Sequence, residues 1–280
     1  MRKSQGLLVR QSAKRAVGGS TPPLTTTLQD SHGRGSATAG PHERPNAVKL
    51  FLDESGNGNV SQPLIVGAVE LGDDADDVEK RVQDLYKRLC AKGSFVGHPG
   101  YEKFRRNGFH SSTDPLDVSG PFLDLIQTLF FRAYMVVTDR TGVPGNTEAE
   151  RIEFMYVKLL SDLLIRHRDE PELLCIIEQS DGMGSIIRRL PDSATRRAYE
   201  TLGKAGPLPQ LKIVMAAKAD YMSMAIVDYV MSAVTRWLQA DCTTNPENWP
   251  YRAFREIEPF ISILYSFEHG RLSSRKDPLH

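Results

Sequence analysis

Cysteine is scarce in this sequence. Only Cys90, Cys175 and Cys242 occur in 280 residues, far apart and without a CxxC pair. This odd number and wide spacing exclude a disulfide framework and show no zinc-binding pattern, so we expect a protein of the reducing cytoplasm. Long hydrophobic runs are lacking as well. No stretch approaches the roughly 18 apolar residues that a membrane span requires, so we expect no membrane partner.

Net charge is also lacking, because 35 Lys and Arg balance 35 Asp and Glu. The balance hides an asymmetry along the chain. Residues 1–45 hold seven of the basic and two of the acidic side chains, which leaves 28 basic and 33 acidic side chains for the remainder. Such a body lacks the broad basic surface by which proteins grip nucleic acid through phosphates alone. A nucleic-acid partner would therefore require local patches, metal ions or the basic segment.

Composition divides the chain into a tail and a body. Residues 1–45 are rich in Gly, Ser, Thr and Pro and show no sustained periodicity, which predicts a disordered basic tail. Its Arg-rich, acid-poor start also resembles an organellar transit peptide, an alternative that stays open beside a flexible extension. With 40% hydrophobic and 25% charged residues overall, we expect a single α/β domain over residues 46–270 and a flexible C-terminus over 271–280.

The body begins with a pattern that is typical of a β-hairpin. Two apolar runs, at 47–53 and 63–69, flank the turn-forming segment Glu54-Ser55-Gly56-Asn57-Gly58-Asn59. Apolar spacing then predicts alternating elements: helices at 74–91, 120–130, 147–168, 183–203, 220–239 and 251–265, and strands at 133–137, 173–177 and 211–215. Strands that alternate with helices predict a mixed sheet, flanked by helices, whose later strands are parallel.

Three carboxylates stand among hydrophobic residues, where a charge is costly unless it is paired. Asp53 ends the first strand, Glu178 directly follows a later strand, and Asp228 interrupts the apolar pattern of the long late helix. Carboxylates from two strand ends and one helix are a usual protein contribution to an Mg²⁺ or Mn²⁺ pair. Such metal ions would activate water for cleavage of a phosphodiester bond.

Four segments resemble the domain-of-unknown-function 3800 family: Leu52-Asp53-Glu54-Ser55-Gly56-Asn57, Phe109-His110, Ile176-Ile177-Glu178, and Val227-Asp228-Tyr229-Val230-Met231-Ser232-Ala233-Val234. The resemblance spans residues 47 to about 240. It implies a ribonuclease H-like fold and a nuclease with divalent metal ions. It also implies that Asp53 is the anchor metal ligand, Glu178 the acid on the neighbouring strand and Asp228 the helical acid.

Other residues have two interpretations each. His110 is a candidate general acid or metal neighbour, or a plain loop histidine. Asp181, before a glycine, is a metal ligand or a turn residue, and Lys218 neutralises a phosphate or is simply exposed.

The sequence therefore predicts a divalent-metal-dependent nuclease or phosphodiesterase, with Asp53, Glu178, Asp228 and His110 as catalytic residues and a nucleic acid or nucleotide as substrate. The alternative is a non-catalytic binding or regulatory module on the same fold. Ala225 and Val227 favour this alternative, because the family usually has Gln and Ala at those positions.

Overall fold

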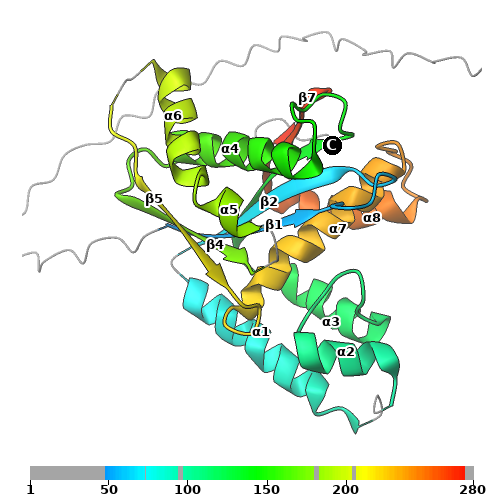
Figure 1. Ribbon diagram of the computed structural model, residues 1–280. Coiled ribbons are helices and arrows are strands. Elements are labelled where there is room, and N and C mark those ends of the chain that lie inside the picture. The colour runs from blue at the N-terminus through cyan, green and yellow to red at the C-terminus, as the bar shows by residue number, and fades with distance from the viewer. Residues whose placement is uncertain (1–47, 73, 94–96, 180–182, 204–205, 275–280) are drawn as a thin grey trace, which may run out of the picture. The chain divides into compact units, whose positions relative to one another are not determined.

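The structure, a computed structural model, describes residues 48–72, 74–93, 97–179, 183–203 and 206–274. The tail expected over residues 1–45, and Asp181, lie outside these ranges. The tail and its boundary with the body therefore stay predictions. The described residues form one sheet with helices on both of its faces (Figure 1).

The sheet holds seven strands among the described residues, in the order β5-β4-β1-β2-β3-β6-β7. Their bounds are β1 Val48–Ser55, β2 Leu64–Leu71, β3 Phe131–Thr138, β4 Glu172–Glu178, β5 Gln210–Ala216, β6 Ile261–Ser266 and β7 Gly270–Ser274. β2 is antiparallel to β1 and β3, whereas β4 is parallel to β1 and β5 is parallel to β4. β6 is parallel to β3, and β7 is antiparallel to β6. The opening hairpin and the parallel later strands are confirmed.

Two hydrophobic cores lie on opposite faces of this sheet, and the helices divide between them. The helices are α1 Ala75–Cys90, α2 Pro99–Asn107, α3 Leu116–Ile126, α4 Glu148–Arg166, α5 Met183–Ile187, α6 Leu190–Leu202, α7 Ala225–Gln239 and α8 Trp249–Ile257. Phe51 of β1 packs in the core that includes α1, α3, α7 and α8. Leu50 and Leu52 pack in the other core, with α4 and α6. Successive strand residues thus point to opposite faces.

Gly67 of β2 allows α7 to lie unusually close to the sheet. A Cβ atom there would come within 2.9 Å of Met231 Sδ and 3.1 Å of Val227 Cγ2, both on α7. Gly67 pairs with Asp53 across the β1–β2 ladder. The missing side chain therefore brings the first turns of α7 beside the end of β1.

Several expected elements differ from the sequence prediction. The expected helix over 251–265 is wrong in its second half, because α8 ends at Ile257 and residues 261–266 form β6. Pro259 cannot continue the helix, and the burial of β6 follows a strand pattern. Part of the C-terminus expected to be flexible, residues 271–274, belongs to β7.

The helices differ in smaller ways. The stretch at 183–203 forms two helices, with Pro191 in the first turn of the second, and the helix expected from residue 220 begins at Ala225 after a 3₁₀ turn. The sequence did not predict α2. No helix in the described part of the chain is long and apolar enough to cross a membrane, and the three cysteines are free.

Candidate active site

A pocket of about 430 Å³ lies where β1 and β4 end, beside α7. Asp53, Glu178, Asp228 and His110, the four residues predicted from the sequence, all line it. The pairing of Leu52 with Ile177 in the parallel β1–β4 ladder places Asp53 and Glu178 on adjacent strand ends. Because side chains alternate along a strand, both point to the face that α7 covers. The structure thus brings the predicted residues into one pocket.

Asp228 lies in the first turn of α7 and is fixed by the loop that follows α2. Its Oδ2 accepts a hydrogen bond from the Ser111 backbone N–H at 3.0 Å, and its Oδ1 accepts one from the Ser111 hydroxyl at 2.6 Å. His110 Nδ1 lies 3.3 Å from Asp228 Oδ2, and 43% of the His110 side chain is exposed. Asp228 is therefore held in one orientation, while His110 is open to a substrate.

The same loop is tied to α7 a second time. Asp114 Oδ2 accepts hydrogen bonds from the His110 backbone N–H at 2.7 Å and from the Tyr229 hydroxyl at 2.6 Å. Burial raises the pKa of Asp114, although these hydrogen bonds oppose the shift. The position of His110 is therefore set by α7 on both sides of the loop.

Lys218, just beyond the end of β5, places a positive charge among the carboxylates. Its Nζ lies 3.2 Å from Glu178 Oε2 and 3.8 Å from Asp228 Oδ2, and 8% of the side chain is exposed. Burial alone would lower the pKa of Lys218, but the charges of Asp228, Glu178 and Asp53 outweigh it and raise that pKa. The lysine is therefore a buried cation, rather than the exposed side chain that was one of its two interpretations.

The pKa of Asp53 shows the combined effect of burial and of the neighbouring charges in this cluster. Burial, and then the charges of Asp228, Glu54 and Glu178, raise the pKa of Asp53 well above its usual value, with Lys218 opposing them. Its Oδ1 accepts a hydrogen bond from the Glu54 backbone N–H at 2.9 Å. Ionisation of Asp53 is therefore disfavoured here, and a cation bound beside it would favour its ionised form.

Glu54 has a different environment from Asp53. Its Oε2 accepts a hydrogen bond from the hydroxyl of Tyr156, on α4, at 2.9 Å. Burial raises the pKa of Glu54 despite this hydrogen bond. Neighbouring strand residues point to opposite faces, so Glu54 is held from the α4 side while Asp53 points toward α7.

The donor set matches a hard divalent cation in kind and in charge. Carboxylate oxygens are the ligands that Mg²⁺ and Mn²⁺ prefer, and burial, followed by the charges of the neighbouring carboxylates, raises the pKa of Asp53. In the described part of the chain, however, no three His, Cys, Asp or Glu side chains lie close enough together to hold one ion. Lys218 Nζ contacts two of the three carboxylates, those of Glu178 and Asp228.

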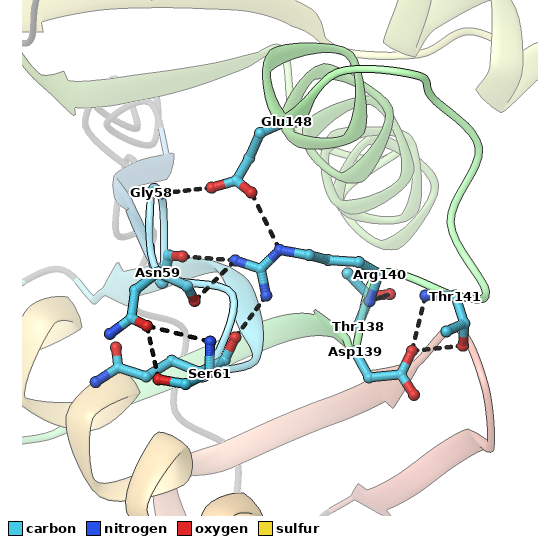
Figure 2. Close-up of polar contacts among 10 residues, drawn as sticks. Gly58, Asn59, Ser61, Thr138, Asp139, Arg140, Thr141 and Glu148 are labelled. Carbon is cyan, nitrogen blue, oxygen red and sulfur yellow. Dashed lines mark hydrogen bonds and ion pairs between the residues drawn. The ribbon is translucent and has the colours of Figure 1, made fainter.

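One wall of the pocket is the β1–β2 loop, and Arg140 holds it from behind (Figure 2). Arg140 Nη2 donates to the backbone oxygens of Gly56 at 2.7 Å and Asn59 at 3.2 Å, and Nη1 donates to that of Gln62 at 2.5 Å. Arg140 itself has a positive φ of 78°, an unfavourable backbone conformation for a residue with a side chain. Three loop carbonyls therefore depend on one guanidinium group.

Glu148, in the first turn of α4, completes this contact. Its Oε2 accepts from Arg140 Nε at 3.1 Å, and its other oxygen accepts from the Gly58 backbone N–H. Figure 2 shows Glu148 reaching the loop from the start of α4 and Arg140 reaching it from the segment between β3 and α4. The hydrogen bond from Arg140, with smaller contributions from Gly58 and Arg151, holds the pKa of Glu148 below its usual value. The sequence did not indicate the contacts of Arg140 and Glu148 with this loop, since they join segments about 80 to 90 residues apart.

No family model matches the sequence, and no curated protein matches it. Among solved structures, the chain is similar to ribonuclease HII of Archaeoglobus fulgidus, solved in complex with PCNA, with a TM-score of 0.35 and 16% identity over 75% of this chain and 86% of that one. It is also similar to ribonuclease H2 from Pyrococcus horikoshii OT3, with a TM-score of 0.34 and 10% identity over 75% and 83% of the two chains. A third similar structure is Bst-RNase HIII in complex with Mn²⁺, with a TM-score of 0.34 and 11% identity over 77% and 71%.

Similarities at this level of identity and TM-score do not indicate an activity. The fold class follows from the order and the directions of the strands in the sheet. The order β5-β4-β1-β2-β3, with β2 alone reversed among the five, is a ribonuclease H-like arrangement opened by an antiparallel hairpin. The predicted α/β fold class, a mixed sheet flanked by helices, is confirmed. Membership of the domain-of-unknown-function 3800 family stays a prediction.

Proposed function

We propose that the protein is a divalent-metal-dependent phosphodiester hydrolase that acts on nucleic acid. The observation that carries this proposal is the meeting of Asp53, Glu178 and Asp228 in one pocket, with the pKa of Asp53 raised by burial and by the other carboxylates. Clustered carboxylates repel one another and so destabilise the fold. Such a cluster is therefore typical of a site that binds a cation or takes part in catalysis.

Each residue has a role that its surroundings support. Asp53, Glu178 and Asp228 do not lie close enough together in this structure to hold one ion; they would hold Mg²⁺ or Mn²⁺ after Lys218 leaves them and they move together, and the metal would supply an activated water and charge stabilisation at the phosphate. Ser111 orients Asp228 through two hydrogen bonds. His110 is exposed beside Asp228 and would donate a proton to the leaving oxygen as its bond to phosphorus breaks. Once the ammonium group of Lys218 leaves Glu178 and Asp228, it can neutralise a phosphate of the substrate.

A second function is favoured by Lys218 in its observed position. An ammonium group between Glu178 and Asp228 already satisfies two of the carboxylates. A protein that never exchanges this lysine for a metal ion would be a non-catalytic binding or regulatory module on the same fold.

The two functions are separated by a hydrolysis assay on the full-length chain. End-labelled single-stranded DNA, duplex DNA, RNA and an RNA–DNA hybrid are incubated with Mn²⁺, Mg²⁺ or chelator. We expect cleavage of at least one substrate with metal and none in chelator. Asp53→Asn should lower the rate at least about 100-fold, the scale on which loss of one preorganised electrostatic contact lowers kcat.

A matched control is Asp124→Asn, which removes the charge of an exposed aspartate on α3. This variant should cleave at the wild-type rate. Equal cleavage by wild type and Asp53→Asn would place the activity elsewhere or in a contaminant. Binding of nucleic acid without cleavage in any metal would support the non-catalytic module.

A further inference from the structure

The pocket continues from the carboxylates along one face of α7. Beyond Asp228, its lining residues on α7 are Ser232, Thr235, Arg236 and Gln239. Spacings of four, seven, eight and eleven residues keep these side chains on one side of the helix. At 1.5 Å per residue, Arg236 lies about 12 Å along the helix axis from Asp228. The polar face of α7 therefore runs from the carboxylate of Asp228 to the guanidinium group of Arg236.

Arg236 is a cation without a carboxylate partner among the described residues. Among the described residues it makes no salt bridge, and its guanidinium carbon lies 5.1 Å from the ring centroid of Trp249. Trp249 is the first residue of α8 and is 50% exposed, although large aromatic side chains are normally buried. The guanidinium group of Arg236, at the far end of the pocket lining, thus lies against a half-exposed indole that stands beside the pocket.

Thr235 adds an unsatisfied polar group to the same face. Its side chain is 7% exposed, and its Oγ1 has no hydrogen-bond partner in the part of the chain that the structure describes. A buried hydroxyl without a partner costs free energy that a bound polar group can recover. Thr235 lines the pocket one residue before Arg236.

We propose that this end of the pocket is a subsite for a single nucleic-acid strand, in which Arg236 binds a backbone phosphate and Trp249 stacks on a base. The inference rests on the proposed function and names the form of its substrate. Stacking on an indole requires a base whose face is free, which a single strand offers and an intact duplex does not. The distance of about 12 Å corresponds to roughly three stacked nucleotides at 3.4 Å each. The carboxylates and the subsite can therefore contact one strand at once.

The slightly negative formal charge of residues 46–280 is consistent with a strand that is bound through few phosphate contacts. Residues 46–280 hold 28 basic and 33 acidic side chains, so a strand is not attracted by a broad positive field. Binding then depends on individual cations together with base stacking. We expect a shallow dependence of affinity on salt concentration, because each phosphate contact contributes only about 0.7 to the logarithmic slope.

Tryptophan fluorescence tests this subsite directly, since the sequence has two tryptophans and Trp237 is 1% exposed. The full-length protein is titrated in chelator, where no cleavage occurs, with a 12-nucleotide strand of thymidines, the matching RNA, and a duplex. Both single strands should quench the emission of Trp249 saturably, and the duplex should bind more weakly. Absence of quenching, or tighter binding of the duplex, would overturn the subsite.

Variants separate the two contacts by anisotropy of a labelled strand. Trp249→Ala should weaken binding about 5- to 100-fold, the range for loss of one stacked base, whereas Trp249→Phe should retain most of the affinity. Arg236→Gln should reduce the salt slope by about 0.7. Arg196→Gln removes an exposed arginine of α6, on the opposite face of the sheet, and should change neither quantity.

The outcomes for the subsite and for hydrolysis are distinguishable. Wild-type affinity in both Trp249→Ala and Arg236→Gln would overturn the subsite even if the enzyme cleaves nucleic acid. Strand binding that depends on Trp249 and Arg236, without cleavage in any metal, would support the subsite and contradict only the hydrolase.

Discussion

Lys218 Nζ lies 3.2 Å from Glu178 Oε2, so a buried ammonium group contacts a carboxylate that the sequence predicts as a metal ligand. The same nitrogen lies 3.8 Å from Asp228. Two carboxylates, together with the electrostatic effect of Asp53, keep this lysine charged despite its burial. Lys218 and a divalent ion would therefore compete for the same oxygens.

The first prediction concerns Lys218→Met. Breaking a buried ion pair costs about 3–5 kcal/mol, and since 35% of the Glu178 side chain is exposed we expect a smaller loss of roughly 1–2 kcal/mol without metal. The melting temperature should fall by about 2–8 °C. Millimolar Mn²⁺ should then stabilise this variant more than wild type, because the competing ammonium is gone. Differential scanning fluorimetry measures both effects.

Lys212→Met is a matched control for that experiment. Lys212 lies on β5 and pairs with Glu172 at 2.5 Å, but 49% of its side chain is exposed. This variant should melt near the wild-type temperature and respond to Mn²⁺ as wild type does. A smaller response of Lys218→Met to Mn²⁺ would show that Lys218 and the metal do not compete.

The second prediction concerns Arg140→Gln. Glutamine cannot reach three backbone oxygens at once, so the β1–β2 loop should lose its support and the pocket wall should become mobile. Hydrogen exchange at the amides of Asn59 and Gln62 should speed up about tenfold or more, because loss of about 1.4 kcal/mol per site gives that factor. Arg140→Lys should not restore protection, since an ammonium lacks the planar fork.

Arg81→Gln serves as the control for that measurement, because Arg81, on α1, donates to the side chain of Thr128 on the surface rather than to this loop. Exchange at Asn59 and Gln62 should be unchanged in it. If Arg140→Gln leaves exchange in the loop at the wild-type rate, Arg140 does not position the pocket wall.

A third prediction follows from Asp228→Asn. Burial is the largest cause that raises the pKa of Asp53, and the charge of Asp228 is the next. The substitution preserves shape and removes that charge, so the pKa of Asp53 should fall while the fold is retained. Carboxyl chemical shifts followed by NMR over a pH titration measure the change, with Asp124→Asn as the reference. An unchanged titration of Asp53 would mean that the two carboxylates are not coupled.

The fourth prediction concerns pH stability at the other end of the sheet. Burial opposes ionisation of Glu70, but His167, whose Nε2 lies 3.5 Å from Glu70 Oε2, the hydrogen bond from Tyr134 and the charge of Arg132 outweigh it and lower the pKa of Glu70 to about 2. A carboxylate whose pKa is lowered in the folded state contributes stability above its unfolded value of about 4.5 and loses it as the pH falls toward 2. Glu70→Gln should therefore flatten the acid unfolding curve, followed by circular dichroism, between these pH values. A curve as steep as that of wild type would contradict this.

The sequence predicted the parts of the site that depend on local patterns. The hairpin followed from two apolar runs around a turn, and Asp53 and Glu178 followed from their places at strand ends. The place of Asp228 among the apolar residues of the late helix followed from the helical period. These features depend on neighbouring residues, and the structure brings the three carboxylates to one pocket.

The remaining features depend on contacts between distant segments. Arg140 is 84 residues from Gly56, and its hydrogen bonds to the loop arise only when β3 lies beside β2. The pairing of Lys218 with Glu178 depends on β5 lying beside β4. The interpretation of residues 261–265 as helix failed because a short apolar run does not distinguish strand from helix before its neighbours are known.

Titration of the full-length protein with Mn²⁺ by isothermal calorimetry tests the central claim, that Asp53, Glu178 and Asp228 form a divalent-metal site. Wild type should show saturable binding, Lys218→Met should bind more tightly, and Asp53→Asn should lose the binding heat while Asp124→Asn keeps it. The same saturable heat in Asp53→Asn as in wild type, or no heat in any variant, would contradict the metal site.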